Sequence, residues 1–231
     1  MVEDKDTSIL IDAGKSGREL EARAKKLGKN IENVDGILIT HAHSDHIQGA
    51  GILSRRYNIP IYITKPAFYD SKNKLGNVSE KIFTTGTPFK IKNLVINPVQ
   101  TSHSVDSCGF VIDKFGLFTD TGTVTRQMTD IFPKLKGLLL ESNHDIDMVI
   151  KGPYPYHLKN WILSDVGHLN NIDASHLIQD YGKNLDFTLL GHLSGMNNTE
   201  EMVKKTFETL VKRKINYEVC DRNKETGIFN I

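Results

Sequence analysis

The sequence has little cysteine and no long hydrophobic run. The two cysteines, Cys108 and Cys220, lie far apart, and neither stands in a C-x-x-C or zinc-finger spacing. This excludes a disulfide framework, and two reduced thiols are typical of a cytosolic protein. No apolar stretch approaches the roughly 18 residues of a membrane-spanning helix, and no charged-then-apolar leader opens the chain. We therefore expect a cytoplasmic protein with no membrane partner.

An excess of charge of one sign is also lacking. The chain has 29 Lys and Arg against 28 Asp and Glu, a net charge of +1. This balance gives no overall attraction to nucleic acid, so a polyanionic substrate would have to meet a local patch. With 39% apolar and 25% charged residues, the composition is that of a globular protein. The 231 residues contain no linker or composition break, which predicts a single domain over residues 1–231.

What the sequence does contain is a cluster of histidines in the motif His41-Ala42-His43-Ser44-Asp45-His46. An apolar run at residues 36–40 precedes the motif and a helical periodicity follows it, which predicts a loop at the carboxyl end of a strand. Alternation points His41 and His43 the same way, whereas Asp45 and His46 open the helix and can serve a second metal. Imidazole and carboxylate suit zinc and its first-row neighbours. Random placement would give this spacing only about once in a thousand shuffles, so a merely polar surface loop is the weaker interpretation.

Other predicted strands also end in histidine or acidic residues. These residues are Asp12, His103, Asp120, Glu141 and His192. Strands that each deliver such a side chain at their carboxyl end predict one cleft along one edge of a sheet sandwich. His168 also follows an extended run and a glycine, so the residues alone do not separate it from His192 as a ligand.

The rest of the pattern predicts an α+β fold of two packed sheets with helices on the outer faces. Residues 1–6 are highly charged and are expected to be frayed. The last helix is predicted over residues 198–214, with Asn198 as its N-cap and Glu201 completing a capping box. Residues 217–220 and 228–231 are predicted to be closing strands.

This arrangement resembles the metallo-β-lactamase superfamily over nearly the whole chain. The longer strings are similar to the YycJ (WalJ) branch of nuclease-like hydrolases. These strings are Leu140-Glu141-Ser142-Asn143-His144-Asp145, Tyr154-Pro155-Tyr156-His157-Leu158-Lys159, Gly167-His168-Leu169-Asn170-Asn171 and Gly191-His192-Leu193-Ser194. The resemblance implies an αββα sandwich of two mixed β-sheets with a dinuclear metal site at one edge. It also implies hydrolysis of phosphodiester bonds, with 5′-exonuclease activity on DNA suggested for that branch.

The resemblance further implies a role for each residue of the site. The implied ligands are His41, His43 and His103 for one ion, Asp45, His46 and His192 for the other, and Asp120 between the two. Asp45 and His168 are the implied catalytic residues, with His168 donating a proton to the leaving oxygen; a structural, hydrogen-bonded histidine is the alternative. Asp12, Glu141 and His144 are expected to support the ligands from behind. Zn²⁺ suits the two metal positions best, and Mn²⁺ or Fe²⁺ also fit.

The chain departs from the family pattern in several places. It starts after the usual first strand and Gly/Ser-rich turn, which motivates a homodimer that completes the cleft as a hypothesis. Trp161 stands where a basic residue is common and Asn170 where serine is common, both at the expected substrate rim. Tyr154, Tyr156 and Trp161 would stack on bases or pack the sheet edge, and both interpretations stay open.

The sequence is therefore compatible with three functions. The first is a nuclease that cleaves DNA from a 5′ end. The second is a phosphodiesterase for a small nucleotide such as a cyclic nucleotide, which the near-zero charge favours. The third, from another class, is a non-catalytic protein that binds nucleotides or a partner protein, and the complete ligand set argues against it.

Overall fold

The computed structural model describes all residues from 1 to 231, and its strands fall into two mixed β-sheets of five and seven strands. The chain divides into two compact units. Unit 1 comprises residues 1–98 and 105–113, and unit 2 comprises residues 99–104 and 114–231. No helix combines the length and the apolar character that a membrane span requires.

Unit 1 contains the whole five-stranded sheet. Its strands, in spatial order, are β1 (Val2–Asp4), β2 (Thr7–Ile11), β3 (Gly36–Leu38), β4 (Ile61–Thr64) and β5 (Glu80–Phe83). Strand β1 pairs antiparallel with β2, and all other neighbours are parallel. The expectation of a frayed N-terminus is therefore wrong for residues 2–4, because their backbone pairs with that of β2 despite their charged side chains.

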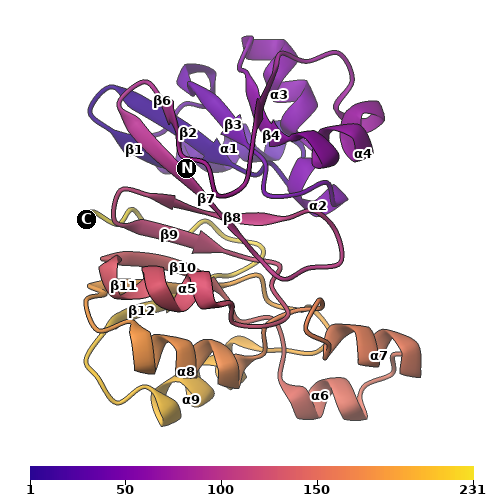
Figure 1. Cartoon of the computed structure of the whole chain (residues 1–231), viewed down its shortest axis with the longest axis vertical. Helices are drawn as coiled ribbons and strands as arrows, with labels where there is room; N and C mark the ends of the chain where they lie inside the picture. Colours follow the sequence, from indigo (N-terminus) through magenta and orange to yellow (C-terminus); the bar gives the residue numbers. More distant parts are fainter. The chain divides into compact units, whose positions relative to one another are not determined.

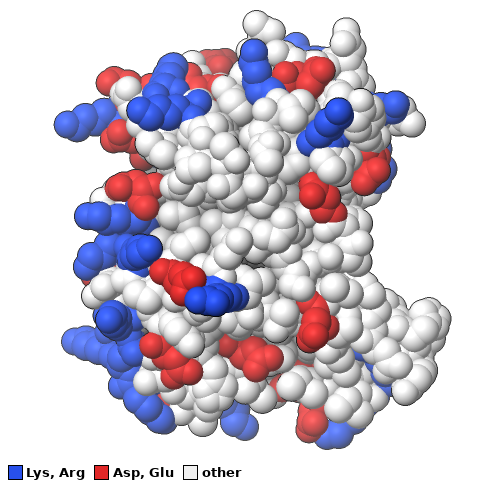
Figure 2. All heavy atoms as spheres, in the orientation of Figure 1, with Lys and Arg blue, Asp and Glu red and all other residues white.

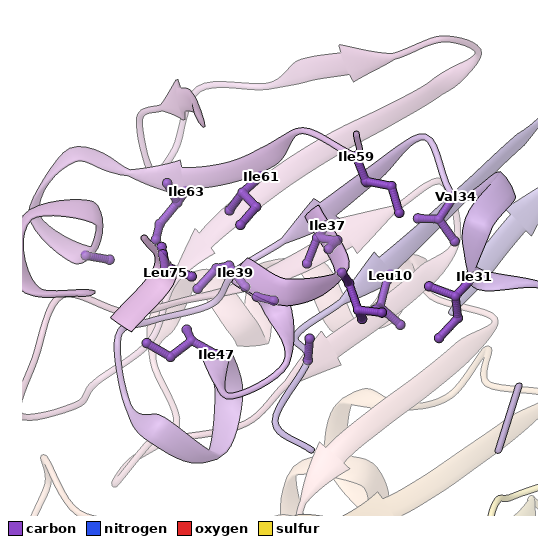
Figure 3. Packing of buried hydrophobic residues seen from close by; sticks show 14 residues of the cluster. Leu10, Ile31, Val34, Ile37, Ile39, Ile47, Ile59, Ile61, Ile63 and Leu75 are labelled. Carbon is purple, nitrogen blue, oxygen red and sulfur yellow. The ribbon is translucent and has the colours of Figure 1, made fainter. Parts of the chain in front are cut away.

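Helices cover one face of this sheet. They are α1 (Gly17–Lys26), α2 (Ser44–Ile47), α3 (Ala50–Tyr57) and α4 (Lys65–Leu75), together with a 3₁₀ turn at Ile31–Asn33. Figure 3 shows the core that this layer buries, in which Ile37 and Ile61 come from the strands, Ile39 directly follows β3 and Ile47 comes from α2. Burial of these aliphatic side chains stabilises the unit, at about 25 cal/mol per Å² of apolar surface removed from water.

The other face of the sheet packs on further strands of the same unit. These are β6 (Phe89–Ile91), β7 (Leu94–Gln100) and β8 (Cys108–Ile112). Leu38 lies on this face, opposite to its neighbours Ile37 and Ile39, and joins a second core with Ile96 and Phe110. A strand that is buried on both faces has apolar residues at successive positions. This explains why residues 36–39 could be predicted as a strand from the sequence.

Unit 2 is built on four parallel strands. They are β9 (Phe115–Phe118), β10 (Gly137–Glu141), β11 (Phe187–Gly191) and β12 (Asn216–Val219). Its helices are α5 (Arg126–Ile131), α6 (Ile146–Lys151), α7 (Tyr156–Ile162), α8 (Asn171–Tyr181) and α9 (Glu200–Leu210), with a 3₁₀ turn at Phe132–Lys134. Figure 1 shows α8 and α9 side by side along the outer face of these strands, in orange and yellow. Two mixed sheets with helices on their outer faces confirm the predicted α+β fold.

The C-terminal region differs from the prediction in three details, the first being that the last helix ends at Leu210 rather than at residue 214. Helix α9 is capped by Thr199, whose side chain accepts a hydrogen bond from the Met202 backbone N–H. Asn198 does not cap it because its amide instead donates to the backbone carbonyls of Ser142 and Asn143. Residues 228–231 form no strand; Phe229 stacks on Phe187 with ring centroids 4.8 Å apart, so this segment is held by side-chain packing. Both cysteines are free thiols, as predicted.

Candidate metal centre

In unit 1, the histidine motif begins directly after β3 and runs into α2. Asp12, at the end of the neighbouring strand β2, adopts a left-handed backbone conformation with φ of 54°. One oxygen of its carboxylate accepts hydrogen bonds from the Thr40 hydroxyl at 2.9 Å and from His46 Nδ1 at 2.7 Å. The other oxygen accepts from the Thr40 backbone N–H at 2.9 Å. Asp12 thus ties the loop to β2 and fixes the ring of His46 so that Nε2 is the atom presented to a metal.

The three imidazoles of the motif lie together. The ring centroid of His41 is 4.5 Å from that of His43 and 4.1 Å from that of His46. Nδ1 of the buried His41 lies 3.0 Å from the Thr40 hydroxyl, so Nε2 is again the remaining ring nitrogen. Asp45 is different, because its side chain is 71% exposed and its carboxylate lies 3.7 Å from His46 Nε2. Thr40 was not among the predicted site residues, although its position between the strand and the motif is a signal for this role.

A close backbone approach holds this loop in place. The His46 carbonyl accepts a hydrogen bond from the Ala13 N–H at 2.7 Å, and the Ala13 carbonyl accepts one from the Gly49 N–H at 2.7 Å. A Cβ atom on Gly14 would stand 1.6 Å from the Asp45 carbonyl oxygen, so only glycine fits there. The turn after β2 therefore acts as a backbone support for the motif.

In unit 2, parallel strands deliver the predicted residues to one edge. Asp120 follows β9, Glu141 ends β10 and His192 follows β11. Asp120 and His192 have positive φ angles of 55° and 57°, which turn their side chains away from the direction of the strand. One side-chain ligand atom from each of Asp120, Glu141, His168 and His192 lies within 4.8 Å of the others. Carboxyl ends of parallel strands meet at one edge of a sheet, which explains how residues 72 positions apart come together.

The centre of this group is the buried carboxylate of Glu141. Its Oε1 atom accepts hydrogen bonds from Nδ1 of His168 at 2.8 Å and from Nδ1 of His192 at 2.7 Å. Its Oε2 atom accepts from the backbone N–H groups of Thr121 at 3.0 Å and Leu169 at 3.3 Å. Burial alone would raise the pKa of Glu141, but the hydrogen bonds and charges of the two imidazoles outweigh it and hold the pKa well below its usual range. Glu141 is therefore an ionised acceptor shared by two rings.

The geometry distinguishes His192 from His168. Nε2 of His192 lies 3.5 Å from Oδ2 of Asp120, as expected for two ligands of one ion. Both rings place Nδ1 within hydrogen-bond distance of Glu141 Oε1, but the His168 nitrogen that faces Asp120 is this same Nδ1, 3.9 Å from Oδ1. His103 resembles His192: its Nδ1 lies 3.1 Å from the Gly167 carbonyl oxygen and its Nε2 lies 3.8 Å from Asp120 Oδ1.

His144 lies outside this group of contacts. Its ring is buried, and neither ring nitrogen has a hydrogen-bond partner. Burial, together with the charge of the neighbouring His168, lowers the pKa of His144 to about 4, against the opposing charges of Glu141, Asp145 and Asp173. It is a neutral core histidine that makes no hydrogen bond to any of the predicted ligands.

The donor chemistry in both units fits divalent metal ions. His41, His46, His103 and His192 each have Nδ1 within hydrogen-bond distance of a hydroxyl, carboxylate or carbonyl oxygen, which leaves Nε2 as the ligand atom. Metal-binding histidines in proteins are commonly oriented in this way. The fold and these residues define the class of metal-dependent hydrolases.

Comparison with known proteins identifies the family. The model of the Beta-lactamase superfamily domain matches residues 7–193. The chain is 35% identical over 218 residues to exodeoxyribonuclease YycJ of Bacillus anthracis, which covers 89% of this chain and 81% of the relative. It is 36% identical over 209 residues to exodeoxyribonuclease WalJ of Streptococcus pneumoniae, covering 86% and 78%. The chain therefore belongs to the β-lactamase superfamily, and the predicted resemblance is confirmed.

Solved structures agree on the fold. The metallo-β-lactamase fold protein YhfI of Bacillus subtilis superimposes with a TM-score of 0.69 at 18% identity, covering 94% of this chain and 86% of that one. Zn²⁺-bound PqqB of Methylobacterium extorquens gives a TM-score of 0.73 at 12% identity, covering 95% and 83%. At these identities the likeness establishes the metallo-β-lactamase fold alone.

Proposed function

We propose that this protein is a dinuclear metal-dependent phosphodiesterase that degrades DNA from a 5′ end. The observation that carries the proposal is the carboxylate–imidazole arrangement of Glu141, His168, His192 and Asp120. It occurs in a chain about one-third identical to relatives named exodeoxyribonucleases. The side-chain arrangement supports hydrolysis, and the similarity to these relatives supports DNA as the substrate.

The proposed ligands follow the sequence motif. They are His41, His43 and His103 for the first ion, Asp45, His46 and His192 for the second, and Asp120 for both. Imidazole and carboxylate donors favour Zn²⁺, with Mn²⁺ or Fe²⁺ as alternatives. When bound, two such ions supply a hydroxide at neutral pH and neutralise charge on the phosphodiester.

The protein residues around the ions have separate tasks. Asp12 and Glu141 hold ligand imidazoles in position through Nδ1. The exposed carboxylate of Asp45 is proposed to act both as a ligand and as an acceptor that orients the attacking water. His168 is proposed to donate a proton to the leaving oxygen, because Glu141 accepts from its Nδ1 and thereby orients the ring.

One observation favours the rival substrate, a small phosphodiester. The chain has 29 Lys and Arg against 28 Asp and Glu, so its net charge of +1 gives no overall attraction to a polyanion. In the view of Figure 2, Lys and Arg side chains gather along the left edge and the middle of the face is largely uncharged. A polymer-specific nuclease ordinarily gains affinity from positive charge around its site. The test therefore has to include both kinds of substrate.

The test is hydrolysis of 5′-labelled single-stranded DNA, a panel of cyclic nucleotides and bis-p-nitrophenyl phosphate, each with Zn²⁺ and with Mn²⁺. Asp120→Ala is the control, since it removes the carboxylate proposed to serve both ions. We expect release of 5′ nucleotides from DNA by the native protein and none by the variant. Turnover of a cyclic nucleotide with intact DNA would favour the small-molecule function, and silence on all three with metals bound would indicate a hydrolase of some other ester or a non-catalytic binder.

A further inference from the structure

We propose that Trp161 is the platform on which the 5′-terminal base of the substrate stacks, an inference that rests on the proposed function. Trp161 lies at the end of α7 in unit 2. Its ring centroid is 5.3 Å from that of His168, with the two planes at 90°, and 6.1 Å from that of His103. Tyr154, Tyr156 and Trp161 were the aromatic residues considered for base stacking. Of these three, Trp161 is the one whose ring contacts histidines of the site.

The indole is accessible rather than enclosed. Trp161 is half-buried, and its ring N–H has no hydrogen-bond partner within the protein and is not among the buried unsatisfied groups. A structural tryptophan in a core normally finds a partner for this N–H. An indole that contacts the histidines of the site and leaves its ring N–H to solvent is suited to receive a planar ligand.

The backbone that carries this indole is anchored at several points. The Trp161 carbonyl accepts hydrogen bonds from the Ser164 backbone N–H at 3.1 Å and the Ser164 hydroxyl at 2.8 Å. A Cβ on Gly167 would stand 2.2 Å from that carbonyl oxygen, so the chain passes closely beneath it. The same Gly167 accepts a hydrogen bond from His103. A surface fixed before binding loses little conformational entropy when a ligand stacks on it.

The chemistry of the proposed reaction determines which base this is. Release of a 5′ mononucleotide forms a bond from the water oxygen to phosphorus and breaks the bond from phosphorus to the 3′ oxygen of the terminal nucleotide. That 3′ oxygen takes the proton from His168, so the terminal nucleotide is the leaving group. Trp161 packs on His168 and therefore lies on the leaving side.

Stacking also agrees with the charge around α7. The surface over α7 in Figure 2 is mostly uncharged, so binding there depends on an aromatic face more than on phosphate attraction. Because every base offers a π-face, such recognition tolerates any sequence.

The chain contains one tryptophan, so its intrinsic fluorescence reports on Trp161 alone. The probe is a 5′-phosphorylated oligothymidylate whose terminal residue carries either thymine or no base, titrated into the non-cleaving Asp120→Asn variant. We expect quenching by the oligonucleotide with the terminal thymine and at most weak quenching by its abasic counterpart.

Kinetics give the second measurement. Trp161→Ala should raise KM about tenfold for the thymine-ended substrate and less than about twofold for the abasic one, while Trp161→Phe should retain most of the difference. A tenfold change corresponds to about 1.4 kcal/mol, within the range known for base stacking. Tyr156→Ala is the matched control, because Tyr156 lies on the same helix, is 79% exposed and contacts no other ring.

The outcomes separate this inference from the proposed function. Hydrolysis of DNA with equal quenching by both oligonucleotides, or an equal rise in KM for both after Trp161→Ala, would refute the stacking role and leave the nuclease function. Selective quenching without any hydrolysis of DNA would refute the nuclease function and leave the stacking role.

Discussion

At the scale of single residues, Glu141 serves two imidazoles through one oxygen atom. Glu141→Gln removes the charge and places an amide N–H₂ where either the imidazole or the backbone donors need an acceptor. We expect the affinity for the second metal ion to fall about 10- to 100-fold. Competition with a chromogenic chelator measures this, with Glu201→Gln in the exposed first turn of α9 as control. Unchanged affinity would mean that Glu141 only fills space.

The role of His168 can be separated from that of a ligand by changing the leaving group. A 3′ alkoxide needs a proton when it leaves, whereas p-nitrophenolate does not. We expect His168→Gln to lower kcat on DNA about 10²- to 10⁴-fold, with a much smaller effect on bis-p-nitrophenyl phosphate. Metal content, measured by mass spectrometry, should stay at the native value. Loss of metal, or an equal loss of rate on both substrates, would contradict the proposal.

Residue types and spacing were sufficient to propose a set of ligands but not to show how these side chains are held. The spacing in the motif fixes that His41 and His46 come from one loop, because a strand and a helix start are recognisable around it. The shared oxygen of Glu141 and the contact between Trp161 and His168 depend on segments distant in sequence. No local pattern encodes such contacts, so they could be found only in the folded structure.

At the scale of elements, the site is made where strands end in an unusual backbone conformation. Six residues other than glycine have positive φ, and three of them, Asp12, Asp120 and His192, are predicted site residues. Such conformations cost about 1–3 kcal/mol each and persist where the surroundings enforce them. The three strand ends were predictable from apolar runs. The left-handed turns were not, because propensity alone disfavours them.

The turn after β2 offers a test of this backbone support. Gly14→Ala places a methyl group against the backbone carbonyl of Asp45. Backbone atoms cannot move aside as the end of a flexible side chain could. We expect the free energy of unfolding to fall by about 1–3 kcal/mol and metal affinity to fall with it, because the motif loop must shift. Denaturant unfolding and chelator competition measure the two effects. Gly227→Ala is the control, since nothing lies near that position, and an equal effect of both substitutions would refute the idea.

At the scale of the whole molecule, stability should depend on pH through His144. Its pKa is about 4 when folded, against about 6.5 in the unfolded chain. Between these values the unfolded state binds more protons, so stability is full above about pH 6.5 and decreases as the pH falls toward 4. Between pH 7 and pH 5, we expect the free energy of unfolding of the metal-free protein to fall by about 1–2 kcal/mol more than that of a His144→Gln variant.

Urea unfolding at several pH values, in the presence of a chelator, measures this difference. The exposed His176, on α8 of the same unit, provides the control variant His176→Gln, which should keep the native pH dependence. Equal pH dependence in the native protein and His144→Gln would show that another group is responsible.

Bound metal should stabilise the folded chain as a whole, because the proposed ligands come from segments between residues 41 and 192 that are assembled only by folding. An ion that binds the native state at 100 times its dissociation constant adds about 2.7 kcal/mol, which for a chain of this size corresponds to about 5–10 °C in Tm. We therefore expect a chelator to lower the Tm of the native protein by that amount and to leave the Tm of Asp120→Ala almost unchanged. Addition of Zn²⁺ and Mn²⁺ separately to the stripped protein then shows which ion restores the Tm at the lower concentration. A native Tm that no chelator changes would mean that the imidazoles and carboxylates are held by the protein alone, and the proposed dinuclear chemistry would fall with it.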